Sequence, residues 1–290
     1  MENPATHSEQ SDGATLQNRW SHFVKSFKTL FSQKQKSFKT RLFLLFVAFL
    51  KKCYPKENLH RLEESIKFHQ GWIDSTDYNP LQKPTSFLYL GLSSKPWYKP
   101  CEYDTLKLVA DKLEKNASDI ENEWLAHRSW GRNLVSRASP SDRHPSLKED
   151  DWGEFILWKE GKFTEAGLSL FPKTVKVVSE LESFLIPFGQ VVFFVLKPGV
   201  TLPPHHDASN IDITCQLGLI IPENCGIRVG DETRNWIRGK VLFFDHSFEH
   251  EAWNKSQQAR VVLLLDLCHP ELTKIERSLL WMYARLFLGY

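Results

Sequence analysis

The feature that most constrains the fold is a series of short apolar runs in the second half of the chain. Each run is separated from the next by proline, glycine or polar residues, and the runs cover residues 191–196, 213–221, 227–229, 241–244 and 261–267. Short apolar runs bounded by turn-forming residues are typical of β-strands. Because no helical pattern lies between them, they indicate an antiparallel sandwich, jelly roll or barrel rather than a parallel sheet. We therefore expect a mainly β domain.

Helical patterns dominate the part of the chain before these runs. Residues 57–75 and 101–125 carry apolar side chains at helical intervals. The stretch from Tyr78 to Pro84 is typical of a linker, and residues 139–150 of a loop. Three regions are predicted: a basic amphipathic helical region over residues 1–84, a β domain over 85–275 and an apolar carboxyl-terminal helix over 276–290.

The amino-terminal region combines an aromatic stripe with positive charge. Residues 1–56 contain ten Lys and Arg against three Asp and Glu, which gives +7 and leaves −5 for residues 57–290. One helical face would carry Trp20, Phe23, Val24, Phe27, Leu30, Phe31 and Phe38. Such a helix suits an anionic membrane surface, which residues 15–52 are predicted to contact. The alternative is a helix packed on the body of the protein with a solvated basic face. The mildly acidic remainder does not indicate a nucleic-acid partner.

Targeting and redox signals are few. The longest clean apolar run, Leu42 to Leu50, is shorter than the roughly 20 residues of a spanning helix and begins too late for an ordinary signal peptide. The five cysteines form no CxxC pair and no zinc-like spacing, so no disulfide framework is expected. We predict a cytoplasmic protein that is at most peripheral on the inner membrane.

Three polar segments of the β region hold the candidate catalytic residues. On an extended backbone His205 and Asp207 would share one face while His206 points away. With His250 they would supply two imidazoles and a carboxylate, a ligand set that suits non-haem Fe(II) with open positions for a co-substrate and O₂. Arg260 begins an apolar run, and its guanidinium fork matches the distal carboxylate of a dicarboxylate.

Single residues of these types carry little information, and alternatives remain open. A lone His is more often a surface or structural residue than a metal ligand. We expect His206 and His246 to point outward or to support neighbouring groups. Trp253 would either line a pocket or pack in the sheet. Asp245 and Glu249 are expected to orient neighbouring groups or cap turns.

Several motifs together resemble the aspartyl/asparaginyl β-hydroxylase family, over about Leu88 to Leu272. The motifs are Pro204-His205-His206-Asp207-Ala208-Ser209-Asn210, Leu217-Gly218-Leu219-Ile220-Ile221-Pro222, Trp236, Gly239-Lys240, Ser247-Phe248-Glu249-His250-Glu251-Ala252-Trp253, Arg260, Asp266 and His269-Pro270-Glu271-Leu272. The resemblance implies a double-stranded β-helix core, jelly-roll or cupin-like, with flanking amino-terminal helices.

The resemblance also implies Fe(II), 2-oxoglutarate as co-substrate, and O₂. It makes His205, Asp207 and His250 the metal ligands and catalytic centre, and Arg260 the anchor of 2-oxoglutarate.

Two departures from the family pattern concern these roles. The animal peptidyl hydroxylases carry Gly where this chain has Asp207, so this chain keeps a full ligand triad. They place Arg and His where this chain has Thr214 and Gln216. These two residues remain candidate co-substrate contacts, although Gln216 offers a hydrogen bond without charge.

We therefore expect a 2-oxoglutarate-dependent dioxygenase that hydroxylates an unactivated carbon, most consistent with an aspartyl/asparaginyl-type β-hydroxylase. Its substrate would be a peptide or a carrier-bound amino acid. The basic amino-terminal region and the apolar segment Leu279 to Leu288 favour an alternative, a hydroxylase of membrane-lipid acyl chains of the lipid A or ornithine-lipid type. A second alternative is a non-enzymatic, membrane-associated binding module on the same fold.

Overall fold

The computed structural model describes residues 37–127 and 151–289, and the chain divides into two compact units between Lys56 and Glu57. In the smaller unit the described residues 37–56 form a helix over residues 37–53. The larger unit holds every described strand and begins with helix α2 (His60–His69). The contacts thus place a boundary earlier than the predicted one after residue 84. The predicted stripe from Trp20 to Phe31 lies outside the described residues.

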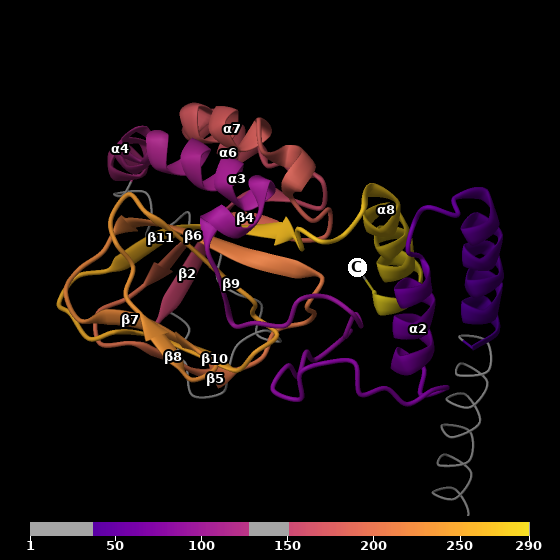
Figure 1. Ribbon diagram of the computed structural model, residues 1–290. Coiled ribbons are helices and arrows are strands. Elements are labelled where there is room, and N and C mark those ends of the chain that lie inside the picture. Colours follow the sequence, from indigo (N-terminus) through magenta and orange to yellow (C-terminus); the bar gives the residue numbers. More distant parts are fainter. Residues whose placement is uncertain (1–36, 128–150, 290) are drawn as a thin grey trace, which may run out of the picture. The chain divides into compact units, whose positions relative to one another are not determined.

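Two antiparallel sheets form the core of the larger unit (Figure 1). The first has the strand order β1-β9-β6-β11-β4-β2-β3 and the second the order β5-β10-β7-β8. The strands are β1 (Trp97–Tyr98), β2 (Trp152–Lys159), β3 (Lys162–Phe163), β4 (Gln190–Leu196), β5 (Thr201–His205), β6 (Asp212–Ile220), β7 (Cys225–Val229), β8 (Glu232–Arg234), β9 (Val241–Phe244), β10 (His250–Asn254) and β11 (Arg260–Cys268). The predicted double-stranded β-helix is confirmed.

Side-chain alternation along the strands of the large sheet separates two apolar layers. In β11 the odd-numbered residues Val261, Leu263 and Leu265 join the cluster on the outer face, under the helices. Val262 points the other way and packs with Trp97 and Ile227 between the two sheets. This alternation follows from the period of two of an extended chain. It also sends Arg260 and Asp266 to the same inner side as Val262.

Helices cover the outer face of the large sheet, as Figure 1 shows above β11 and β6. They are α3 (Asp104–Lys115), α4 (Ala117–His127), α6 (Glu165–Leu170) and α7 (Pro172–Ser179), with short helical turns η1 (Pro100–Glu102) and η2 (Glu182–Phe184). The prediction of one continuous helix over residues 101–125 is wrong, because the helix is interrupted at Asn116 and forms α3 and α4 instead. There the Asn116 side-chain amide donates to the carbonyl of Lys112 at 2.8 Å, in competition with the regular backbone bonds.

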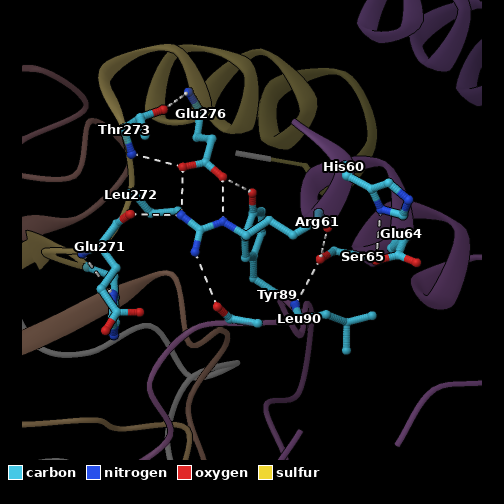
Figure 2. A network of polar contacts seen from close by, with 12 residues as sticks. His60, Arg61, Glu64, Ser65, Tyr89, Leu90, Glu271, Leu272, Thr273 and Glu276 are labelled. Atoms are coloured by element: carbon cyan, nitrogen blue, oxygen red, sulfur yellow. Dashed lines mark hydrogen bonds and ion pairs between the residues drawn. The ribbon is translucent and has the colours of Figure 1, made fainter. Parts of the chain in front are cut away.

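The carboxyl-terminal helix α8 (Lys274–Tyr283), followed by the π-helical turn η3 (Ala284–Leu288), lies beside α2 (Figure 1). The Arg61 guanidinium of α2 donates through Nε and Nη2 to the two carboxylate oxygens of Glu276 in α8, at 2.7 and 2.8 Å. Tyr89 donates its hydroxyl to the same carboxylate at 2.6 Å, as Figure 2 shows. The Glu276 carboxylate is fully buried, so this network holds α2, α8 and Tyr89 together. The backbone N–H of Leu90 also donates to the Ser65 hydroxyl of α2 at 2.8 Å.

Candidate metal and co-substrate site

His205 and His250 face one another across two neighbouring strands of the smaller sheet. They are direct partners in the antiparallel pairing of β5 with β10, and their ring centroids lie 4.1 Å apart. Residues paired in this way project to the same face of a sheet. Strand β5 ends at His205, so the next residues leave the sheet and Asp207 can turn back towards the two rings.

Each imidazole is held by a backbone carbonyl two residues earlier in the chain. The Nδ1 atom of His205 lies 2.7 Å from the carbonyl oxygen of Pro203, and that of His250 lies 3.0 Å from the carbonyl of Phe248. A carbonyl accepts only from a protonated nitrogen, so Nδ1 carries the proton and Nε2 offers a lone pair. Burial lowers the pKa of His250 to about 4, which keeps this ring neutral at pH 7. Both rings therefore present Nε2, the nitrogen away from the carbonyl, as the atom that could bind a metal.

Asp207 completes the set of three. Its Oδ1 lies 4.0 Å from Nε2 of His205, and its Oδ2 lies 3.6 Å from Nε2 of His250. One ligand atom from each of the three residues lies within 4.8 Å of the others. Desolvation raises the pKa of Asp207, but the hydrogen bond from His246 and the neighbouring imidazoles lower it well below its usual value. The structure thus brings together the three predicted ligands, and His206 lies outside the cluster.

A second polar cluster lies beside Asp207 and was not predicted as a group. His246 Nδ1 is 3.3 Å from Asp207 Oδ2, and its Nε2 is 3.1 Å from Asp212 Oδ2. Burial lowers the pKa of His246, but Asp212 and Asp207 raise it well above its usual value. Asp266 joins Asp212 and His246, and burial raises its pKa to about 7. His246 is therefore buried and faces Asp207 and Asp212, so it does not point outward.

The turn that carries His246 is fixed by Asp245, which caps it as expected. The Asp245 carboxylate accepts from the backbone N–H and the hydroxyl of Ser247, at 2.8 and 2.5 Å, and from the Gln82 side chain at 2.6 Å. Burial raises the pKa of Asp245 to about 6. These contacts set the path of the chain between β9 and β10 and hence the position of His250.

Two residues of the same segment face away from the metal ligands. In β10 the buried residues are His250, Ala252 and Asn254, so Glu251 and Trp253 lie on the opposite face. The Trp253 ring covers Gly226 of the neighbouring strand, where a Cβ atom would lie 2.4 Å from the ring. Trp253 is therefore a sheet residue rather than a wall of the pocket.

Arg260 is buried between the sheets, and no described anionic side chain pairs with it. Its side chain is only 1% exposed, and Nε and Nη1 have no hydrogen-bond partner among the described residues. The guanidinium carbon lies 4.6 Å from the ring centroid of Trp236 and 5.3 Å from that of Phe194. Burial lowers the pKa of Arg260 to about 9. A buried cation of this kind is costly unless an anion joins it, so the arrangement fits a carboxylate ligand.

Arg260 and the metal ligands are linked through one apolar cluster between the sheets. Trp236 and Phe244 belong to this cluster, and the Phe244 ring lies 5.9 Å from that of His250. Gln216 accepts from the Trp236 indole N–H at 2.8 Å, which places Gln216 beside the ring that covers Arg260. Thr214 lies instead at the other end, with its hydroxyl 3.1 Å from Nδ1 of His246. Of the two predicted co-substrate contacts, Gln216 is therefore connected to Arg260 by a shared contact with Trp236, whereas Thr214 contacts His246.

The comparison with protein families agrees with this geometry. The model of the family described as aspartyl/asparaginyl beta-hydroxylase matches residues 114–270, more than half of the chain. The chain belongs to this family. The matched range includes both clusters of polar residues, Gln216 and Arg260, so the resemblance inferred from the motifs is confirmed.

Similar proteins come from animals and bacteria. The human aspartyl/asparaginyl beta-hydroxylase is 37% identical over 190 residues, which are 64% of this chain and 24% of that protein. The ornithine lipid ester-linked acyl 2-hydroxylase of Rhizobium tropici is 27% identical over 207 residues, 66% of this chain and 72% of that protein. A cupin with a double-stranded beta-helix fold from Methanocaldococcus jannaschii matches 29% of this chain and 72% of its own, with 15% identity and a TM-score of 0.23. The chain spans about a quarter of the length of its human relative.

Proposed function

We propose that the chain is an Fe(II)-dependent hydroxylase that uses 2-oxoglutarate and O₂ to hydroxylate an unactivated carbon. The observation that carries the proposal is a three-residue ligand cluster in the same β-helix as a buried arginine without an anion. In the reaction a substrate C–H bond, O₂ and 2-oxoglutarate give an alcohol, succinate and CO₂. One oxygen atom enters the alcohol and the other enters succinate.

The residues have separate roles in this reaction. His205, Asp207 and His250 would hold Fe(II), which supplies the activation of O₂ when it is bound. Arg260 would bind the distal carboxylate of 2-oxoglutarate with two N–H groups. Trp236 and Phe194 cover the guanidinium and exclude water, which strengthens a charged hydrogen bond made there. Gln216 would hold Trp236 in place from the other side.

The metal site is tested by the loss of one ligand. A folded His250→Ala chain should lose most of its Fe(II) affinity, because removal of one imidazole leaves two ligands where three are needed. Equilibrium dialysis under anaerobic conditions, followed by iron analysis, measures this loss. His206→Ala is the matched control, since its imidazole lies beside the cluster in sequence but outside it in space. Unchanged iron affinity in the His250 variant would overturn the assignment.

The reaction is tested by succinate release from 2-oxoglutarate. Peptides that contain Asp or Asn should stimulate release by the Fe(II)-loaded protein, and a new hydroxyl should add about 16 Da to the peptide, the mass of one oxygen atom. Stimulation by vesicles of ornithine lipid or lipid A instead would favour the lipid-hydroxylase alternative. The similarity to the Rhizobium tropici ornithine lipid hydroxylase supports that alternative. Binding of 2-oxoglutarate without succinate under all these conditions would favour the non-enzymatic binding module.

We further propose that the amino-terminal unit contacts an anionic membrane surface. The helix over residues 37–53 exposes Phe38, Leu42, Leu45, Phe46 and Phe49. At 100° per residue these side chains lie within an arc of about 100° on one face. Lys39 flanks this arc on one side, and Arg41 and Lys52 flank it on the other. An exposed apolar stripe between basic residues is typical of a helix that lies in the headgroup region of an anionic bilayer. No described helix is long and apolar enough to cross a membrane.

Changes within the stripe test this contact in the full chain. The triple variant Leu42→Ser, Leu45→Ser, Phe46→Ser should bind vesicles that contain anionic lipid at least about 10-fold more weakly, since three apolar side chains no longer enter the bilayer. The control is Leu108→Ser with Leu168→Ser, which changes exposed leucines of the larger unit. Binding of the original chain should also fall with salt. Equal vesicle binding by the triple variant would contradict the proposal.

A further inference from the structure

His246 lies in a continuous line of polar contacts that ends on a metal ligand. The Ser209 hydroxyl donates to Asp212 Oδ1 at 2.7 Å, Asp212 Oδ2 lies 3.1 Å from His246 Nε2, and His246 Nδ1 lies 3.3 Å from Asp207 Oδ2. Both ring nitrogens of His246 thus face a carboxylate oxygen. Ser209, Asp212 and His246 are buried, whereas the Asp207 side chain is 47% exposed.

The inner end of this line is rigid. Asp212 begins β6 and pairs with Cys268 at the end of β11, so its backbone belongs to the central strands of the large sheet. His246 is fixed by the Asp245 turn and by its own carbonyl, which accepts from the backbone N–H of Asp207 at 3.0 Å. Asp207 lies beyond the end of β5, and it is the most exposed of the three ligands. Its carboxylate needs a partner if it is to keep one orientation.

We propose that His246, anchored by Asp212, is a positioning residue that holds the Asp207 carboxylate in the orientation in which it binds the metal. This inference rests on the proposed metal site. A residue that orients a ligating carboxylate stabilises the bound metal without touching it. His246 does this from the side of the large sheet, so the smaller sheet supplies the two imidazoles and the larger sheet orients the carboxylate.

A second metal site at Asp212, His246 and Asp266 is the competing interpretation, because their ligand atoms also lie within 4.8 Å of one another. The geometry favours the positioning role. His246 Nδ1 lies 3.3 Å from Asp207, which is not part of that second trio, while Nε2 lies 3.1 Å from Asp212 Oδ2 without a hydrogen bond among the described residues.

The test uses Co²⁺ as the probe and isothermal titration of the full chain. His246→Ala should weaken Co²⁺ binding about 10- to 100-fold while the stoichiometry stays at one Co²⁺ per chain. The d–d absorption of bound Co²⁺ should change, since the carboxylate ligand is no longer held in one geometry. His206→Ala is the control and should bind Co²⁺ like the original chain. The thermal midpoint of each metal-free chain shows whether it is folded.

Asp212→Asn is the second variant, and it carries the test if His246→Ala does not fold. It keeps the imidazole but weakens its anchor, so Co²⁺ binding should weaken in the same direction and by less. Unchanged affinity in a folded His246→Ala chain overturns the inference but leaves the metal site intact. Two Co²⁺ in the original chain and one in the variant would make His246 a ligand and also overturn it. A chain that binds no Co²⁺ fails at the proposed metal site itself.

Discussion

At the scale of single residues, the site depends on side chains whose orientation is fixed before any ligand binds. His205 and His250 have their tautomers set by carbonyls of their own segments, and Arg260 has its position set by two aromatic rings. Such preorganisation lowers the entropic cost of binding. Less of the binding free energy of metal and co-substrate is then offset by the cost of ordering these side chains.

Arg260→Lys tests the anchor for 2-oxoglutarate. Lysine keeps the charge but loses the planar fork, so the dissociation constant for 2-oxoglutarate should rise about 10- to 100-fold, as expected for the loss of a charged hydrogen bond. Calorimetry with the metal-loaded chain measures this, and Co²⁺ affinity should stay near that of the original. Arg238→Lys, a change at an exposed arginine, is the control. An unchanged dissociation constant for 2-oxoglutarate in Arg260→Lys would mean that another residue binds the carboxylate.

Residues proposed to bind the metal or the co-substrate directly were easier to predict than residues proposed to support them. His205, Asp207, His250 and Arg260 carry recognisable chemistry, whereas Asp212 looks like the polar end of an apolar strand. A signal existed: Asp212, Thr214 and Gln216 alternate with apolar residues and must share one face of β6. What the sequence could not show is which partner each would meet, because His246 comes from a turn more than thirty residues later.

At the scale of elements, the apolar runs predicted five strands to within two residues at each end: β4, β6, β7, β9 and β11. Strands β1, β2, β3, β5, β8 and β10 were missed. The sequence of β5 is Thr-Leu-Pro-Pro-His, and two prolines normally argue against a strand. They are accommodated because β5 is an edge strand of the smaller sheet. Strand β10, His-Glu-Ala-Trp-Asn, includes the proposed ligand His250 and is mostly polar, so it lacks the usual apolar pattern of a strand.

The contact between α2 and α8 gives an element-scale prediction. Arg61→Met removes the partner of a fully buried carboxylate on Glu276, so the free energy of unfolding should fall by about 3–5 kcal/mol. Urea denaturation measures the change. Lys67→Met, on the same helix, removes a more exposed ion pair with Glu63 and should cost less than about 0.5 kcal/mol. Equal losses in the two variants would contradict the structural role of Arg61.

The same contact should make stability depend on pH. Burial raises the pKa of Glu276, but the hydrogen bonds from Arg61 and Tyr89 lower it below its usual value. A carboxyl with a lowered pKa in the folded state stabilises the protein above its unfolded pKa of about 4.3, and this contribution is lost as the pH falls through the folded value. The stability difference between the original chain and Arg61→Met should therefore shrink below pH 4. A difference that is constant between pH 7 and pH 3 would exclude this linkage.

At the scale of the whole molecule, charge and structure divide the chain at the same place. The basic residues 1–56 coincide with the smaller compact unit, and the mildly acidic remainder with the larger one. Charge together with the apolar stripe predicted a membrane-contacting region, and charge predicted an acidic body. It could not predict on which side of the boundary residues 57–84 fall, because that depends on the buried contact of Arg61 with Glu276, more than 200 residues apart in the sequence.

Two shortened chains test this division. A chain that begins at Glu57 keeps α2 and every contact of Glu276, so its urea midpoint and Co²⁺ affinity should match those of the full chain, while its binding to anionic vesicles is lost. A chain that begins at Leu81 lacks Arg61 and leaves the Glu276 carboxylate buried with fewer partners. Its free energy of unfolding should be about 3–5 kcal/mol lower than that of the chain from Glu57. If both shortened chains are equally stable, α2 does not belong to the cooperative fold of the larger unit; if the chain from Glu57 still binds vesicles, the membrane contact lies outside residues 1–56.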